Sequence, residues 1–259
     1  RQHLASLAPL AATAQVRLDL LTGRDKGRDR VRKLQDLAEG RTQILIGTHA
    51  LFQSDVQFRD LRLAVIDEQH RFGVAQRMAL GEKGASVDSL VMTATPIPRS
   101  LALAQYGDMD LSLLDEKPPG RKPITTSLAS TERLAEVVAH LAQAIAEGRQ
   151  AYWVCPLVEE SETVNLTAAQ SRFESLRAVL GEGVGLVHGQ MPPAEKDAAM
   201  ARFVAGETRV LVSTTVIEVG VNVPNATIMV IERAESFGLA QLHQLRGRVG
   251  RSHHQAYAY

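Results

Sequence analysis

No glycine in this chain is followed by a lysine, although the chain has 19 glycines among its 259 residues. The sequence therefore lacks the G-x-x-x-x-G-K-[ST] loop that binds nucleotide phosphates in many proteins. It has a single cysteine, Cys155, which excludes an internal disulfide and a zinc site built from several cysteines. The formal net charge is +0, so any binding of nucleic acid depends on local groups of arginine and lysine.

Long hydrophobic runs are also missing. No apolar stretch approaches the ~20 residues that span a bilayer, and no signal peptide pattern precedes the first strand, so we expect no membrane contact and a cytoplasmic location. The chain begins with Arg1 instead of methionine and ends at Tyr259, part-way into an alternating apolar pattern. We therefore interpret it as an internal fragment of a longer protein.

Strand and helix patterns alternate through both halves of the chain. In the first half, strands are expected at 16–21, 43–47, 63–66 and 89–92, and helices at 1–10, from about 74, and at 98–106. In the second half, strands are expected at 124–128, 150–155, 184–187, 210–212 and 228–231, and helices at 134–145, 166–180, 193–204 and 239–246. A polar loop is expected at 159–163.

The segment 117–123, KPPGRKP, contains three prolines and a glycine and disfavours both helix and sheet. The sequence thus predicts an α/β protein with two lobes, each a mostly parallel sheet flanked by helices. We place the first lobe at 1–117, the linker at 118–123 and the second lobe at 124–259.

The pattern LAVIDEQH at 63–70 is the most informative stretch of the chain. Its four apolar residues predict a strand buried on both faces, and Asp67 and Glu68 follow where that strand stops. Ligands of open α/β sheets bind beyond the carboxyl ends of strands. Two adjacent carboxylates there can divide the work of nucleoside triphosphate hydrolysis, one holding Mg²⁺ and the other positioning water. The pattern alone is more typical of a strand that ends in a solvated acidic turn, and the motifs in the rest of the chain reverse this preference.

A basic segment lies earlier in the chain. Between Arg24 and Lys33, six basic residues are mixed with two aspartates. We expect a solvated loop and helix face, and contact with DNA phosphates is the alternative.

Several short stretches then occur in a fixed order along the chain. They are THA at 48–50, DEQH at 67–70, TAT at 93–95, the segment from Ser213 to Asn222, and QLRGRVGR at 244–251. This series resembles the superfamily 2 helicases, whose two RecA-like lobes close over ATP. Within them, the stretches GTHALF, DEQHRFGV, TATPIPR, VHGQM and GLAQLHQLRGRVGR are most similar to the RecG type, which acts on branched DNA.

The resemblance assigns roles to individual residues. It implies that Asp67 binds Mg²⁺, that Glu68 positions the attacking water, and that Arg248 and Arg251 are catalytic arginine fingers. The implied ATP-binding residues are Asp67, Gln69, Gly220, Asn222, Gln244, Arg248 and Arg251. The implied DNA-binding residues are Thr48, His49, Arg71, Arg99, His188, Thr214 and Thr215. Residues implied to couple hydrolysis to movement are His70, Thr93, Ala94 and Thr95.

Two departures from the family pattern stand out. Asn222 replaces the usual aspartate, which keeps a hydrogen-bonding group and removes a charge near the nucleotide. The first lobe is truncated, because the phosphate-binding loop and the wedge domain of the family lie upstream of Arg1. We therefore expect the isolated chain to bind ATP weakly and to hydrolyse little of it.

The resemblance implies an ATP-dependent DNA helicase or translocase that uses ATP and Mg²⁺ to remodel branched or duplex DNA, such as stalled forks and Holliday junctions, in repair and recombination. We expect a monomer in the bacterial cytoplasm, associated with the nucleoid. One alternative is a translocase of the Mfd type, which couples transcription to repair. The other is a non-catalytic DNA-binding module that has lost its phosphate loop.

Overall fold

The structure is a computed structural model, which describes residues 2–68, 80, 83–93, 110–116, 118–156, 162–214 and 223–259. Contacts between residues divide the chain into two compact units, residues 1–111 and 112–259. This division falls within a few residues of the expected linker, and the lobe boundaries given above stay a prediction. Within the described ranges, no helix combines the length and apolar character needed to cross a lipid bilayer.

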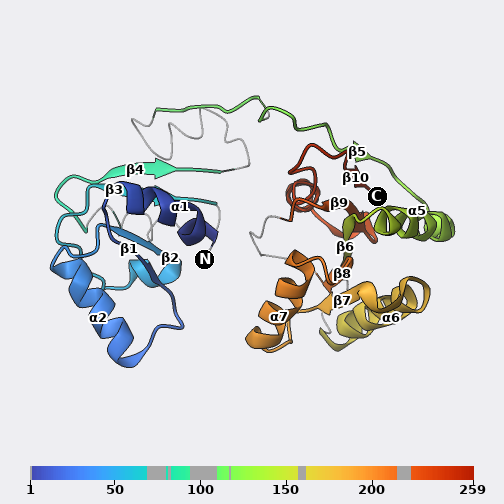
Figure 1. The fold of residues 1–259 in the computed structure, drawn as a ribbon, viewed down its shortest axis with the longest axis horizontal. Helices are drawn as coiled ribbons and strands as arrows, with labels where there is room; N and C mark the ends of the chain where they lie inside the picture. The colour runs from blue at the N-terminus through green and yellow to red at the C-terminus, as the bar shows by residue number, and fades with distance from the viewer. Residues whose placement is uncertain are drawn as a thin grey trace. The chain divides into compact units, whose positions relative to one another are not determined.

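The first unit contains two pairs of parallel strands (Figure 1). Helix α1 (Gln2–Thr13) precedes β1 (Leu18–Leu21), and α2 (Gly27–Ala38) connects β1 to β2 (Ile44–Gly47). A short 3₁₀ helix, η1 (His49–Phe52), follows β2. Strand β3 (Leu63–Ile66) pairs with β4 (Asp88–Val91) in parallel register. The parallel pairing is confirmed here, and so is the alternation of strand and helix from β1 to β2. The helices expected from about residue 74 and at 98–106 lie outside the described residues, except for Leu80.

The prediction that β3 is buried on both faces is wrong for the described part of the chain. Ala64 and Ile66 are buried and pack near Leu80, whereas Leu63 and Val65 are 57% and 54% exposed. Alternate residues of a strand point to opposite faces, and only the face of Ala64 and Ile66 belongs to a described hydrophobic cluster. Helix α1 also extends beyond its expected end at residue 10, to Thr13, and Pro9 lies inside it.

The second unit is built on one parallel sheet of six strands in the order β5-β10-β9-β6-β8-β7. The strands are β5 (Thr125–Thr126), β6 (Gln150–Cys155), β7 (Val184–Val187), β8 (Val210–Thr214), β9 (Ala226–Ile231) and β10 (Tyr257–Ala258). The helices are α5 (Leu134–Ala146), α6 (Glu162–Leu180), α7 (Pro193–Val204) and α8 (Leu239–Arg246). Short 3₁₀ helices at 131–133, 181–183 and 234–236 complete the unit.

Helices cover both faces of this sheet, as the continuous apolar runs of its central strands require. Trp153 and Cys155 of β6 belong to a hydrophobic cluster with α5 and α6. Tyr152 and Val154, which point to the opposite face, belong to a second cluster with α7 and with residues of α8. Figure 1 shows β6, β8 and β9 between these helices in the green-to-red half of the chain. The second unit thus has the construction predicted for a lobe, a parallel sheet flanked by helices.

Most expected elements of the second unit agree with the structure. The bounds of β6, β7, α7 and α8 are those predicted, while α6 begins four residues before the expected Leu166 and so takes up part of the expected polar loop. The predicted strand 124–128 shortens to two residues in β5, and β10 was not expected.

Candidate functional site

The two acidic residues of the LAVIDEQH stretch lie at the carboxyl end of β3. Asp67 follows the buried Ile66, and its side chain is 47% exposed, with Oδ2 lying 3.4 Å from Nε2 of His3. Glu68 is half-buried and has a φ of 54°, in the left-handed region that non-glycine residues seldom adopt. Its backbone N–H donates to Oδ1 of Asp67 at 2.9 Å. The chain therefore turns sharply after β3 and presents one exposed carboxylate and one more enclosed one.

Thr93 lies beside this turn. The backbone N–H of Met92 donates to the carbonyl of Ile66 at 2.8 Å, which continues the β3–β4 pairing beyond the last residue of β4. In parallel strands the carboxyl ends meet at the same edge, so Thr93 is placed at the edge that holds Asp67 and Glu68. The sequence-predicted partners Asp67, Glu68 and Thr93 are thus brought together.

Thr48 and His49 follow β2 in the same unit and are both exposed. Gly47 precedes them, and a Cβ atom on this glycine would lie 2.6 Å from the Leu21 carbonyl oxygen and 2.7 Å from the side chain of Leu51. Only glycine fits there, and it lets β2 run directly into η1, with the His49 ring at an edge angle to Phe52. The two polar residues are therefore held on a short, tightly packed turn at a strand end.

The basic segment around α2 is largely occupied by contacts within its own unit. Nζ of Lys33 donates to Asp25 at 2.7 Å and to the Leu20 carbonyl, and Arg30 pairs with Asp55 at 2.8 Å. These contacts support the expected solvated helix face rather than a surface of free positive charge for DNA.

Arg248 and Arg251 of the second unit follow the end of α8. Gln244 lies on α8, Gly247 ends the helix, and Nε of Arg251 donates to the Gly247 carbonyl at 3.1 Å. Burial and the charge of Arg248 lower the pKa of Arg251 from its ordinary value. In the described part of the chain neither arginine pairs with a carboxylate. Two positive charges are thus held near each other without a negative partner, an arrangement suited to binding an anion.

Tyr152 lies under this pair of arginines in the sheet. Its side chain is 2% exposed, and burial raises the pKa of its phenol to about 12, although the charges of Arg251 and Arg248 act in the opposite direction. The phenol therefore stays neutral and leaves the arginine charges uncompensated.

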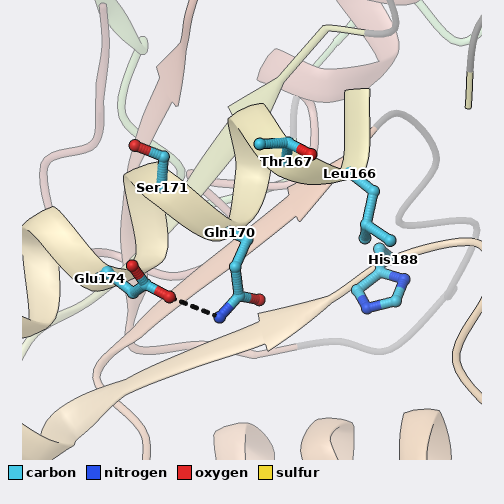
Figure 2. A pocket seen from close by; sticks show the side chains of 6 residues that line it. All are labelled: Leu166, Thr167, Gln170, Ser171, Glu174 and His188. Carbon is cyan, nitrogen blue, oxygen red and sulfur yellow. Dashed lines mark hydrogen bonds between the residues drawn. The ribbon is translucent and has the colours of Figure 1, made fainter. Parts of the chain in front are cut away.

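His188 follows β7 and lines an open depression of about 410 Å³ on the second unit. Figure 2 shows its imidazole facing side chains of α6, among them Leu166 and Gln170. Burial, followed by the charge of Lys196, lowers the pKa of His188, and its Nδ1 atom is buried without a hydrogen bond. The lowered pKa favours the neutral imidazole, which can contact a phosphate as a hydrogen-bond donor.

Thr214, at the end of β8, is only 6% exposed. Its implied contact with DNA stays a prediction. The remaining implied residues lie outside the described part of the chain: Gln69, His70, Arg71, Ala94, Thr95, Arg99, Thr215, Gly220 and Asn222.

The structure is consistent with a Mg²⁺ site in which the protein supplies one carboxylate. Within the described ranges, no three His, Cys, Asp or Glu side chains come together as a metal-binding group. Mg²⁺ is commonly held by one or two carboxylates, with waters and substrate phosphates as the other ligands. The exposed carboxylate of Asp67 fits that requirement, and Mg²⁺ there would neutralise charge on a bound phosphate chain.

Sequence reasoning missed one residue near the arginines. Arg121, in the segment expected to be only a linker, contributes a positive charge that acts on Arg251. The pattern KPPGRKP gives no local signal for this, because the proximity depends on pairing between β5 and β10, which are far apart in the sequence.

Comparison with known proteins gives the same two-part organisation. Residues 1–103 match the family model described as DEAD/DEAH box helicase, and residues 132–253 match that of the helicase conserved C-terminal domain. The chain is 52% identical to the ATP-dependent DNA helicase RecG of Escherichia coli (strain K12) over 256 residues, 96% of this chain and 37% of that protein. It is 50% identical to RecG of Bacillus subtilis (strain 168) over 258 residues, 99% of this chain and 38% of that protein.

Solved structures of helicases also match this chain in fold. A structure of RecG bound to a three-way DNA junction matches with a TM-score of 0.76 and 45% identity, covering 99% of this chain and 33% of that one. Yeast Dbp5 bound to RNA and ADP BeF₃ matches in fold, with a TM-score of 0.70, 16% identity, and coverage of 100% of this chain and 67% of the other. This chain spans little more than a third of the curated relatives described above.

The fold and the matched families define two RecA-like domains of a superfamily 2 helicase. Within that superfamily the chain belongs to the RecG type, to which its resemblance pointed.

Proposed function

We propose that the protein containing this chain is an ATP-dependent DNA helicase or translocase that remodels branched DNA, such as stalled forks and Holliday junctions, in repair and recombination. The observation that carries this proposal is the Asp67–Glu68 pair at the carboxyl end of β3, beside Thr93 of the neighbouring strand. Identity of 50–52% to RecG proteins over nearly the whole chain supports the same reaction.

The two carboxylates have different surroundings and, in this proposal, different roles. Asp67 is exposed and would bind the Mg²⁺ of a nucleotide, which supplies positive charge to the phosphates. Glu68 is more enclosed, and its backbone lies in the left-handed region. We assign Glu68 to hold and polarise the water that attacks the terminal phosphate.

Arg248 and Arg251 would contribute to the same reaction by binding phosphate oxygens. Negative charge on the transferred phosphoryl group and the leaving oxygen is stabilised most by positive groups that are already in place. The backbone contact of Arg251 to Gly247 and the absence of a carboxylate partner in the described ranges keep this guanidinium available. Gln69, Gly220, Asn222 and Gln244 complete the proposed ATP site.

DNA binding is assigned to polar residues at strand ends, among them Thr48, His49 and His188. Hydroxyl and imidazole groups of this kind can donate hydrogen bonds to phosphate oxygens, and such contacts carry no sequence information. The proposed DNA contact is therefore with backbone shape and charge, which suits a protein that acts on junctions of any sequence. We further propose that the protein works as a monomer in the bacterial cytoplasm, near the nucleoid.

The proposal is tested by substituting Glu68→Gln in the full-length protein. This change keeps the size of the side chain and removes the charge that polarises water, so we expect DNA-stimulated ATP hydrolysis to fall by roughly 10²–10⁴-fold. ATP binding and junction binding should stay within twofold of the original protein. Hydrolysis is measured by phosphate release at saturating ATP and DNA.

A matched control is Asp60→Asn. Asp60 is an exposed carboxylate of the same unit that pairs with Arg62, on the turn before β3. It should leave hydrolysis unchanged. Normal turnover by the Glu68→Gln protein would contradict the proposed function.

A further inference from the structure

Three arginines lie near one another in the second unit, and only two of them belong to the helicase sequence pattern. Arg248 and Arg251 follow α8, while Arg121 precedes β5. The charges of Arg248 and Arg121 both act on the guanidinium of Arg251. None of the three forms an ion pair within the part of the chain that the structure describes. Positive charges gathered without a carboxylate repel one another unless an anion lies between them.

The chain holds the segment of Arg121 firmly against the segment of Arg251. Gly250 has a φ of +71°, and a Cβ atom built on it would lie 2.9 Å from Cγ1 of Ile124, so the Ile124 side chain packs directly over this glycine. Gly250 is the neighbour of Arg251, and Ile124 is three residues from Arg121. The position needs a residue without a side chain both for its backbone conformation and for this contact.

Hydrogen bonds fix the same pair of segments a few residues further on. Nε2 of Gln255 donates to the Pro123 carbonyl at 2.8 Å and to Oγ1 of Thr125 at 3.1 Å. The backbone N–H of Thr125 donates to the Ala256 carbonyl at 3.0 Å, where β5 and β10 pair in parallel. Residues 123–125 are therefore attached to the segment that leads into β10, and Arg121 extends from a fixed point rather than from a free linker.

We infer that Arg121 is a third phosphate-binding arginine, which acts with Arg248 and Arg251 on the phosphates of the bound nucleotide. This inference rests on the proposed function. A guanidinium binds phosphate oxygens through two parallel N–H donors, which a lysine ammonium cannot reproduce. Arg121 is exposed, so its guanidinium is accessible to an anion from solvent.

A nucleotide suits this arrangement better than a DNA backbone. A triphosphate concentrates its charge on adjacent phosphates, whereas DNA spreads one charge over each nucleotide along the strand. Two arginines beside the half-buried guanidinium of a third match the concentrated charge. Binding to DNA phosphates is the competing outcome of the experiment.

The test compares Arg121→Gln with Lys122→Gln in the full-length protein. Lys122 is the adjacent, equally exposed cation, so its substitution removes the same charge from the same segment. We expect Arg121→Gln to raise the KM for ATP roughly tenfold, because one charge-assisted interaction with phosphate is lost, and to change kcat less than threefold. Lys122→Gln should keep both values within twofold. Arg121→Lys should recover part of the loss.

Two further measurements separate the possible sources of phosphate. The affinity for a fluorescent ATP analogue without DNA should fall with Arg121→Gln, and the affinity for a three-way junction without nucleotide should stay the same. A loss of junction affinity with an unchanged KM for ATP would overturn the inference. A general loss of stability would also overturn the inference. This would be the case if Arg121→Gln lowered the melting temperature in the absence of nucleotide, if that loss accounted for the change in KM, and if Arg121→Lys did not reverse it.

The Glu68→Gln protein, measured in parallel, distinguishes this inference from the proposed function. If Glu68→Gln stops hydrolysis and Arg121→Gln leaves the KM for ATP unchanged, the role of Arg121 is wrong and the function stands. If Glu68→Gln hydrolyses ATP normally, both are wrong.

Discussion

Arg251 carries its charge in surroundings that oppose it. Its guanidinium is half-buried, two other arginines act on it, and the nearby Tyr152 phenol is neutral because burial raises its pKa to about 12. A phosphate bound to this guanidinium, as proposed, would offset the free energy cost of holding the charge there. Such a residue contributes more to binding an anion than an equally charged residue in water, because its surroundings do not have to be desolvated and ordered when the anion arrives.

At this scale we predict the effect of Arg251→Ala in the full-length protein. Turnover of ATP in the presence of DNA should fall ~10³-fold or more, because an arginine at developing phosphoryl charge is typically worth ~10³–10⁵ in rate. Junction binding without nucleotide should be unaffected. The measurement is single-turnover hydrolysis.

Arg246→Ala is the matched control for this prediction. Arg246 belongs to the same segment, and its Nη2 lies 3.3 Å from Nδ1 of His243. Its loss should slow hydrolysis only several-fold. Equal losses in the two variants would indicate that the segment has been distorted, and the role of Arg251 as a phosphate ligand would then lose its support.

At the scale of the element, α2 is attached to β1 by charges. Nζ of Lys33 contacts Oδ1 of Asp25 at 2.7 Å, lies 3.8 Å from Asp19, and donates to the Leu20 carbonyl. Asp25 also accepts from the backbone and hydroxyl of Thr22. The hydrogen bond from Lys33 contributes most to lowering the pKa of Asp25 to about 2. The turn before α2 and the middle of that helix therefore share one network.

This network predicts a pH dependence of stability. The pKa of Asp25 is lower in the folded chain than its ordinary value, so its contribution is complete above about pH 5 and is lost as the pH falls toward 2. Asp25→Asn should lower the free energy of unfolding by about 1–2 kcal/mol at pH 6, and the difference from the original chain should shrink below about pH 4. Urea unfolding between pH 6 and pH 3 measures this.

Lys33→Met supplies the control through a double-mutant cycle. If the two side chains act through one another, the double variant should lose less stability than the sum of the single variants. A sum that is simply additive, or a difference at pH 6 that persists unchanged at pH 3, would contradict the assignment.

Elements whose signal is local could be predicted from the sequence, and elements that depend on distant partners could not. The bounds of β6 follow from a continuous apolar run, and the positions of Asp67 and Glu68 follow from the point where another run stops. Strands β5 and β10 have two residues each and exist because they pair with each other and with β9. The proximity of Arg121 to Arg251 depends on that pairing, so no local pattern could reveal it.

The exposure of β3 has a similar explanation. Leu63, Ala64, Val65 and Ile66 form a continuous apolar run. Such a run cannot show whether the strand is covered on two faces or on one, because the residues of both faces are apolar. Burial is decided by which segments pack against each face, and in the described ranges only the Ala64 and Ile66 face is packed.

At the scale of the whole molecule, each unit has its own hydrophobic clusters. Those of the first unit contain Leu21 and Ile66, and those of the second contain the fully buried Trp153 and Phe203. Separate cores allow each unit to unfold on its own.

The position of the single tryptophan makes this prediction measurable. Trp153 is the only tryptophan in the chain, and its indole N–H donates to Glu232 within the second unit. Its fluorescence should therefore follow unfolding of the second unit alone, while circular dichroism follows the helices of both. We expect the two urea transitions to have different midpoints. Superimposable transitions would show that the two units unfold as one.

Cys155 lies two residues beyond Trp153 on β6, and it is 3% exposed. Burial raises the pKa of its thiol to about 12, so almost no thiolate is available to react with alkylating or maleimide reagents at neutral pH. The chain therefore behaves toward such reagents as though it had no cysteine. A surface cysteine introduced on each unit would accept a pair of fluorophores without removal of the natural residue, and energy transfer between them would test whether the distance between the units changes when nucleotide is added.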